Sequence, residues 1–327
     1  MRVRGLDSMR FISALIVAIG HYSGLLKDLW EVHLPMIRHL FKFNGPAAVI
    51  VFFIISGFCI HFPYREGGTP IRVSSYYVRR LIRICFPAGI AICIWVLVGL
   101  KMDPPAFSIY WSVLCEVIYY LIFPVLLSLR RRTSWEWIIG LSSLIAGSIV
   151  FLRKEVILAH GGIYPSSVLW TWLLGLPCWL MGCWLAEHYG RFRKVGSAAI
   201  WMTRVGIWVL AWVLLVLKFH LPGIWTSFPF TLNLFAWLAA GWVGLEIARY
   251  LVKKPWTTLE WAGTWTYSLY LMHEVATPLV MRVGINPSCL LGNFLLIFSG
   301  LALSYLFFLT IEKPCHQLAV QISNRLR

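Results

Sequence analysis

Residues 4–21 read RGLDSMRFISALIVAIGH, an apolar run with a guanidinium near its start and an imidazole at its end. These two groups, Arg10 and His21, are separated by about three helical turns, so both point the same way, about 16 Å apart along the axis. An ionisable group at the centre of a membrane helix costs about 2.5–3.5 kcal/mol, which marks it as a candidate functional residue. The alternative is a neutral histidine that is hydrogen-bonded between helices.

The composition of the whole chain is that of a membrane protein. Of its 327 residues, 59% are hydrophobic and 13% are charged, and the mean hydropathy is +0.75. The formal net charge of +16 is spread over small clusters between apolar runs, so nucleic acid is not expected as a partner. The eight cysteines form no CxxC pair and no Cys/His metal spacing, so we predict neither a disulfide framework nor a metal site.

Apolar runs recur along the chain and predict an all-α, polytopic membrane protein with about ten transmembrane helices. The predicted spans are residues 8–26, 43–62, 84–100, 107–129, 137–152, 168–187, 199–217, 228–248, 264–281 and 290–311. If the spans alternate in direction, most of the 29 Lys and Arg residues lie on the side of the N-terminus, which predicts that the N- and C-termini are cytoplasmic. The longest inner connection is 63–83, so we expect one membrane-embedded domain over residues 1–327, with no separate soluble domain.

A second ionisable group lies in the predicted span 107–129. Ser112 and Glu116 are one helical turn apart, and Tyr119 lies beside them. Counted from the ends of the spans, Glu116 lies at about the depth of His21, so we expect the carboxylate and the imidazole to share a buried proton. A purely structural ion pair is the alternative.

Polar residues also reach mid-membrane in the predicted span 264–281. Thr266, Tyr270 and His273 follow helical spacing and form a stripe on one face. We expect His273 to be a packing or substrate-contact residue, with a direct chemical role as the alternative. Asn44 lies at the outer start of another span and is a further candidate for a substrate contact.

A basic cluster precedes the third predicted span. Arg79, Arg80 and Arg83 follow Tyr76, and Arg79 and Arg83 share one helical face. Guanidinium groups match phosphate oxygens in a bidentate geometry, which would suit a nucleotide-like donor such as coenzyme A. The alternative is the ordinary enrichment of basic residues on the inner side of a membrane.

Taken together, these features resemble the acyltransferase-3 family of integral membrane acyltransferases. The resemblance covers nearly the whole chain, in six motifs that occur in order: RGLDSMR with Arg10-x10-His21, the pattern GxxxVxxFFxxSGF from Gly45 to Phe58, Arg79-Arg80-x-x-Arg83-Ile84 with Pro87, WSxxxExxYY at 111–120, WxxxxxYSLYxxH at 261–273, and Glu312-Lys313-Pro314. Cys85-Phe86 before the proline is a local departure that we expect to be harmless.

The resemblance implies about ten helices and an acyl-CoA donor taken from the cytoplasm. It also implies that His21 and Arg10 are essential and that Arg79, Arg80 and Arg83 form a donor-binding element. Some members carry an extracytoplasmic hydrolase-like domain, and we expect this chain to handle the acyl group within its membrane domain.

The expected activity is transfer of an acetyl group from cytoplasmic acetyl-CoA to a hydroxyl of a cell-surface polysaccharide, O-antigen-like, or its lipid-linked precursor, in the inner membrane of a bacterium. His21 is the expected general base with Glu116 orienting its ring, and an acyl-His21 intermediate is the alternative chemistry. Arg10 is a third catalytic candidate, and we also expect it to contact the donor phosphates. The remaining candidates are donor contacts from Arg79, Arg80, Arg83 and Tyr76, and substrate or oxyanion contacts from Ser112, Tyr119, Tyr270, His273 and Asn44. A transporter of a polyol or an acylated lipid or sugar, lined by the same residues, is the alternative function.

Overall fold

The computed structural model describes residues 3–23, 25, 42–65, 68–99, 109–164, 168–192 and 194–326, and this part of the chain contains helices and no β-strand. The long helices are α1 (Leu6–Ser23), α2 (Gly45–His61), α3 (Val73–Leu97), α4 (Tyr110–Arg130), α5 (Trp135–Leu152), α7 (Val168–His188), α8 (Ser197–His220), α9 (Phe228–Tyr250), α11 (Thr266–Arg282), α12 (Leu290–Phe307) and α13 (Lys313–Arg325). Two short helices, α6 (Lys154–Ala159) and α10 (Thr257–Ala262), lie between them.

Each of the ten predicted spans coincides with one of the long helices. Seven stretches of the described residues are long and apolar enough to cross a membrane: Gly45–Tyr64, Val73–Leu97, Tyr110–Arg130, Trp135–Leu152, Ser197–His220, Ile224–Tyr250 and Leu290–Arg325. The helices α1, α7 and α11 are not among them, so the count of about ten stays a prediction. The predicted span ends at residues 26, 100 and 107 lie outside the described residues.

The third helix begins earlier than the sequence predicted. Apolarity alone placed its start at residue 84, whereas α3 begins at Val73 and therefore includes the arginines of the basic cluster. Arginine is a good helix former, and its long apolar stem can lie along a helix while the charged end reaches polar surroundings. The helix therefore extends past the apolar run, and Arg79 and Arg83 lie on it rather than in a connection.

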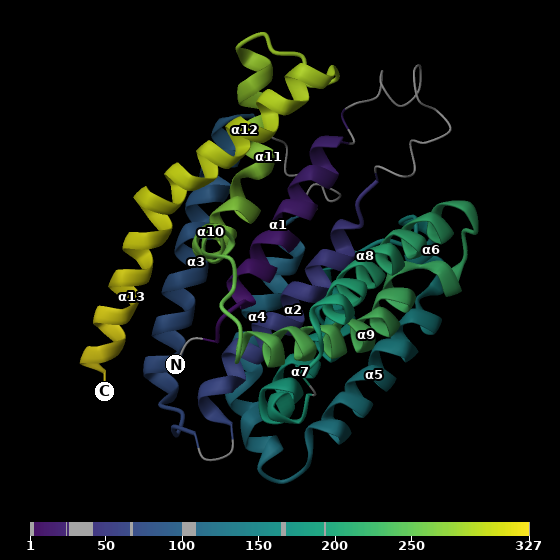
Figure 1. The fold of residues 1–327 in the computed structure, drawn as a ribbon, viewed down its shortest axis with the longest axis vertical. Helices are drawn as coiled ribbons and strands as arrows, with labels where there is room; N and C mark the ends of the chain where they lie inside the picture. Colours follow the sequence, from purple (N-terminus) through teal and green to yellow (C-terminus); the bar gives the residue numbers. More distant parts are fainter. Residues whose placement is uncertain are drawn as a thin grey trace.

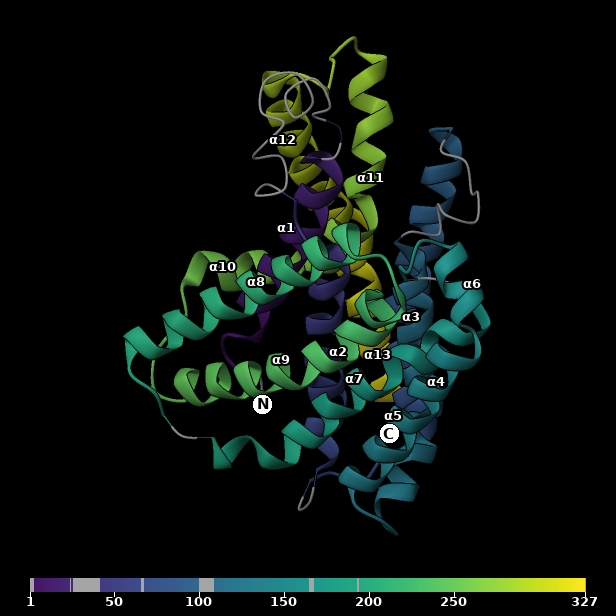
Figure 2. The same ribbon diagram turned by 90° about the vertical axis from the view of Figure 1, so that its right-hand side faces the viewer.

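The helices form two groups that cross one another. In Figure 2, α8 and α9 run across the view, whereas α3 and α11 run up it. Close packing pairs α2 with α7, α5 with α7, α11 with α12 and α3 with α13, and α1 lies between α2 and α11. The labelled ends of the chain both lie in the lower half of Figure 1. That both termini are cytoplasmic stays a prediction.

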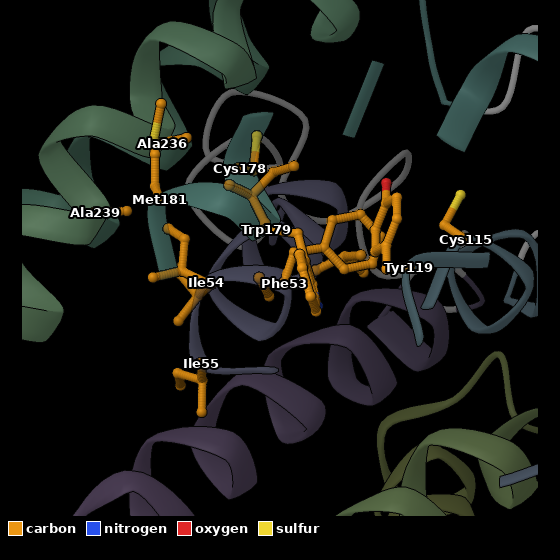
Figure 3. Close-up of a cluster of buried hydrophobic side chains, with 14 of the residues drawn as sticks. Phe53, Ile54, Ile55, Cys115, Tyr119, Cys178, Trp179, Met181, Ala236 and Ala239 are labelled. Carbon is orange, nitrogen blue, oxygen red and sulfur yellow. The ribbon is translucent and has the colours of Figure 1, made fainter. Parts of the chain in front are cut away.

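Helix α2 is the centre of the apolar core, and two glycines let α7 approach it closely. A Cβ atom on Gly182 would lie 2.0 Å from the carbonyl oxygen of Ile54, and one on Gly57 would lie 1.9 Å from that of Trp179. The backbones of α2 and α7 are therefore in direct contact, as small residues permit between membrane helices. Figure 3 shows Trp179 and Met181 of α7 beside Phe53 and Ile54 of α2, with Tyr119 of α4 on one side.

Two carboxylates, one buried and one largely buried, join helices near their ends. Glu246 of α9 accepts hydrogen bonds from Arg204 of α8 at 2.5 and 2.8 Å. Glu187 of α7 lies 2.6 Å from Arg130 of α4 and 2.9 Å from the imidazole of His61 on α2. Burying an acid without such partners would be strongly unfavourable, so each carboxylate fixes the relative position of the helices that it joins.

Candidate active site

A central cavity lies among α1, α2, α3, α4 and α11, next to the junction of α12 and α13. It contains about 940 Å³ of space not filled by atoms, part of it open to solvent. Its polar lining residues are Arg10, Ser56, Arg80, Arg83, Ser112, Glu116, Tyr120, Thr264, Thr266, Tyr267, Tyr270 and Glu312. Six residues predicted from the sequence therefore meet here, from segments far apart in the chain: Arg10, Arg80, Arg83, Ser112, Glu116 and Tyr270.

Three guanidinium groups face the cavity from two helices. Arg10 of α1 is 3.2 Å from the carboxylate of Asp7, one turn earlier on the same helix. Arg80 of α3 lies over the ring of Tyr120, 5.9 Å from its centre, and Arg83 lies one turn further along α3. This concentration of positive charge can bind the phosphate groups of an anionic ligand.

Two hydroxyl groups hold the carboxylate of Glu116 in place. Its carboxylate accepts a hydrogen bond from Ser56 of α2 at 2.5 Å and another from Tyr120 of α4. The hydroxyl of Ser56 also accepts a hydrogen bond from the indole of Trp179 at 3.3 Å. The serine of the SGF motif thus links α2, α4 and α7, while the glycine that follows it permits their close packing.

A second carboxylate enters the cavity from the end of the chain. Glu312 ends a π-helical turn, Phe308–Glu312, that connects α12 to α13. It accepts hydrogen bonds from the backbone N–H and the hydroxyl of Ser268 on α11, at 3.0 and 2.5 Å. Such a turn inserts an extra residue into a helix and is frequent at functional sites. Here it fixes the acid of the EKP motif against α11.

The hydroxyls of Ser112 and Tyr270 form a small cluster in the cavity wall. They lie 2.7 Å apart, and both are within hydrogen-bond distance of the carbonyl of Ile109, at 3.1 and 3.0 Å. Tyr270 is followed one turn later on α11 by His273, whose ring centre lies 6.0 Å away. This cluster therefore connects the cavity to the histidines at the other end of α1.

His21 lies outside the cavity lining and has a different carboxylate partner from the one predicted. Its Nδ1 is 2.7 Å from Oε1 of Glu274 on α11, and its side chain is 36% exposed. Glu116 makes its hydrogen bonds with Ser56 and Tyr120, so the predicted pair of His21 and Glu116 is wrong. Matching depths did not specify the direction of either side chain: α4 turns Glu116 toward Ser56 of α2, whereas His21 points toward Glu274 of α11.

His273 is buried beside His21. The two ring centres are 5.1 Å apart in an edge-to-face arrangement, and Nδ1 of His273 lies 2.9 Å from the carbonyl of Tyr270. Its Nε2 has no hydrogen-bond partner among the described residues. One ligand atom from each of His21, His273 and Glu274 lies within 4.8 Å of the others, close enough for the three to hold a metal ion, although the sequence predicted no metal site.

The remaining predicted residues lie outside the cavity lining, and three of them bond to backbone carbonyls. The hydroxyl of Tyr76 donates to the carbonyl of Tyr120 at 3.1 Å, and that of Tyr119 donates to Trp172 at 2.7 Å. Asn44 caps α2, and its amide donates to the carbonyl of Ala211 at 2.8 Å. These contacts support helix packing. Arg79 is also absent from the lining.

Two acids that sequence reasoning left without a role belong to the site. Glu274 and Glu312 both lie within or at the end of predicted spans, and an acid at such a position is itself a signal of function. Tyr120 and Tyr267 complete the aromatic lining of the cavity. Their positions in the motifs at 111–120 and 261–273 were the available indication.

Comparison with known proteins gives one family and one curated relative. The family model described as "Acyltransferase domain" matches residues 3–312. Nodulation protein 10 of Rhizobium leguminosarum bv. viciae is 24% identical over 172 residues, which is 52% of this chain and 40% of the relative, so the match spans less than half of that protein. No solved structure matches the chain.

Proposed function

The chain belongs to the acyltransferase-3 family, and on this premise we propose that it transfers an acetyl group from acetyl-CoA to a hydroxyl of a cell-surface glycan or its lipid-linked precursor. It is a multi-pass membrane acyltransferase by its family and its apolar helices. The observation that carries the finer proposal is the arrangement along α1, which contributes Arg10 to a cavity rich in guanidinium groups and His21 to a carboxylate–imidazole pair. The membrane is the bacterial inner membrane in this proposal.

The arginines support a donor with several phosphate groups. Coenzyme A carries a diphosphate and a ribose phosphate, and Arg10, Arg80 and Arg83 supply three guanidinium groups from two helices. Arg79 is next to this group along α3 and adds charge at the same end. Guanidinium groups bind phosphates with paired hydrogen bonds, so the donor is held by its nucleotide end while its thioester arm extends toward His273 and His21.

His21 is suited to act as a general base. If Nδ1 of the neutral imidazole carries the proton and donates a hydrogen bond to the carboxylate of Glu274, the lone pair of Nε2 stays available to accept a proton. Nε2 then accepts the proton of the acceptor hydroxyl while that oxygen attacks the thioester carbonyl. The C–S bond breaks, and the leaving thiolate takes the proton from the imidazolium. Glu274 stabilises the imidazolium, which is the role predicted for Glu116.

Tyr270 is the proposed donor to the oxygen that becomes negatively charged. Its hydroxyl lies between the cavity and His273, and Ser112 is its neighbour. A hydroxyl placed at a developing oxyanion lowers the barrier by stabilising charge that forms only in the transition state. An acetyl group carried on His21 is the competing chemistry. The family match does not favour the transporter alternative.

The test uses the full chain in lipid nanodiscs with acetyl-labelled acetyl-CoA and a lipid extract that contains lipid-linked glycans. The wild type should release coenzyme A and label the glycan, and His21→Ala should abolish both. The matched control is His160→Ala, which removes an exposed histidine whose ring nitrogen Nδ1 lies 2.8 Å from the carbonyl of Val156 in its own helical turn. Full labelling by His21→Ala would refute the proposal, as would glycan movement across the bilayer without consumption of acetyl-CoA. Labelled acetyl on the wild-type protein that is absent from His21→Ala would favour the covalent route.

A further inference from the structure

A second hollow lies along the face of α1 that points away from Arg10. Ile12 and Ile16 of α1 form one wall, and Trp208 and Val209 of α8 form another. The hollow contains roughly 1950 Å³ of space, part of it open to the surroundings, and most of its lining is apolar. We call it the α1–α8 groove.

The groove carries exposed apolar side chains along its α8 wall. On α8, the lining side chains of Trp201, Val205 and Val209 are 59%, 59% and 51% exposed. Helix α8 packs against α9 and crosses the direction of α1 (Figure 2), so its lining side chains are not covered by a neighbouring helix. In a membrane, exposed apolar side chains on a spanning helix contact hydrocarbon chains, so an apolar chain can enter the groove from the side.

The two ends of the groove differ in charge. At one end Arg204 is neutralised by Glu246, the one acid among the described lining residues, through two hydrogen bonds. At the other end the exposed Lys42 and the buried Lys218 lie over the same ring, that of Phe219, at 5.1 and 4.2 Å from its centre. No acid among the described lining residues lies at this end, so the positive charge of Lys42 would attract an anionic lipid headgroup there.

The Lys42 end of the groove is also the end nearest to His21. Phe43, the next residue, packs against α1 at Gly20, where an added Cβ atom would lie 3.5 Å from the Phe43 side chain, in ordinary van der Waals contact. Gly20 directly precedes His21, which is exposed near the end of α1. Lys42 therefore lies beside the end of α1 that carries the imidazole, so a group attached to a headgroup there can reach His21 around the end of this helix.

We propose that the α1–α8 groove binds the lipid that carries the acceptor, a long-chain isoprenoid alcohol joined to the glycan through phosphate. This inference rests on the proposed function. The isoprenoid chain of this lipid lies between α1 and α8, its phosphate lies at Lys42, and the attached glycan passes over the end of α1 to His21. In the proposed function the acceptor hydroxyl belongs to a glycan, and the carrier lipid joins that glycan to an apolar chain through a phosphate that can pair with Lys42, so the occupant is the carrier.

The direct test is photocrosslinking of the full chain in nanodiscs with a long-chain isoprenoid phosphate that bears a diazirine near its phosphate end. The label should appear on peptides of α1 and α8, and unlabelled isoprenoid phosphate should compete with it. Phosphatidylglycerol at the same concentration should not compete. Equal competition by phosphatidylglycerol would overturn the proposal, because the groove would then be a site for bulk lipid.

Variants of residues in the α1–α8 groove test whether the lipid binds there. Val209→Trp fills the groove and should weaken crosslinking and raise the KM for the lipid-linked acceptor about tenfold, the effect of losing the burial of about two methylene groups. Met202→Trp is the matched control, since Met202 is exposed on the same helix but does not line the groove. Lys42→Ala should weaken crosslinking about fivefold and Lys42→Arg should restore it. Unchanged crosslinking in Val209→Trp would overturn the proposal.

Crosslinking needs no acetyl transfer, so the two proposals can fail separately. If the wild type is labelled in α1 and α8 but transfers no acetyl group, the proposed function is wrong and the lipid site stands. If it transfers acetyl but the label maps to other helices, the lipid site is wrong and the proposed function stands.

Discussion

Replacing Glu274 with glutamine should show that this carboxylate, and not Glu116, serves the imidazole of His21. The two groups are 2.7 Å apart, with the side chain of His21 36% and that of Glu274 18% exposed. Two unit charges about 4 Å apart interact by about 1 kcal/mol in water and about 4 kcal/mol in a protein surface environment, so partial exposure gives about 2 kcal/mol. Removing the charge on Glu274 should therefore lower kcat about 30-fold.

The measurement is kcat for acetyl transfer in a double-mutant cycle with His21→Ala. His21→Ala alone should lose the contribution of a general base, about 10²- to 10⁴-fold. Since Glu274 acts through the imidazole, Glu274→Gln should have no further effect once His21 is gone. Glu116→Gln serves as the comparison: its partners are Ser56 and Tyr120, so its effect should multiply with that of His21→Ala.

The reverse pattern would refute this assignment. If Glu274→Gln and His21→Ala multiply while Glu116→Gln has no effect in the His21→Ala background, the carboxylate that supports the base is Glu116. The structural pairing of α1 with α11 would then be irrelevant to the chemistry.

Three further predictions concern the donor site, the histidines and the core. Arg83→Gln should raise the KM for acetyl-CoA about tenfold, because it removes a charged hydrogen bond to phosphate. Arg132→Gln, a change at an exposed residue outside the cavity, should leave this KM unaltered. Equal KM values in the two variants would contradict the donor site. Zn²⁺ should inhibit acetyl transfer by binding the imidazole of His21, and a chelator should restore the activity, whereas Mg²⁺ should have no effect. Inhibition by Zn²⁺ that persists in a His21→Ala variant with residual activity would contradict this prediction. Gly182→Ala should lower the free energy of unfolding by about 3 kcal/mol, as measured by thermal unfolding in detergent. The control is Gly147→Ala, whose added methyl group meets nothing within 4 Å. Equal stability of the two variants would contradict the close packing of α2 and α7.

Helix positions were predictable from the sequence because burial in a bilayer demands long apolar runs. The start of α3 was not, since the arginines that precede the apolar run continue the helix without adding to its apolarity. The short helix α10 and the π-helical turn at Phe308–Glu312 were likewise invisible, because neither changes the apolar periodicity on which the spans depend.

The site was predictable in its residue types and not in its pairings. Arg10, Arg80, Arg83 and Glu116 do meet in one cavity, as ionisable groups that avoid lipid must. The depth of Glu116 followed from its place in an apolar run, but the direction in which α4 turns it did not, because that direction depends on which helices pack together. Glu274 was therefore overlooked as the partner of His21, although it lies next to a histidine that the motif contained.

Helix α1 has a consequence for redesign. It contains no proline and carries Arg10 and His21 about 16 Å apart on one helix. A movement of this helix at Arg10 therefore also moves His21. Attempts to accept longer acyl groups should therefore reshape α3 or α11 and leave α1 alone, because any tilt that widens the donor side also misaligns the imidazole.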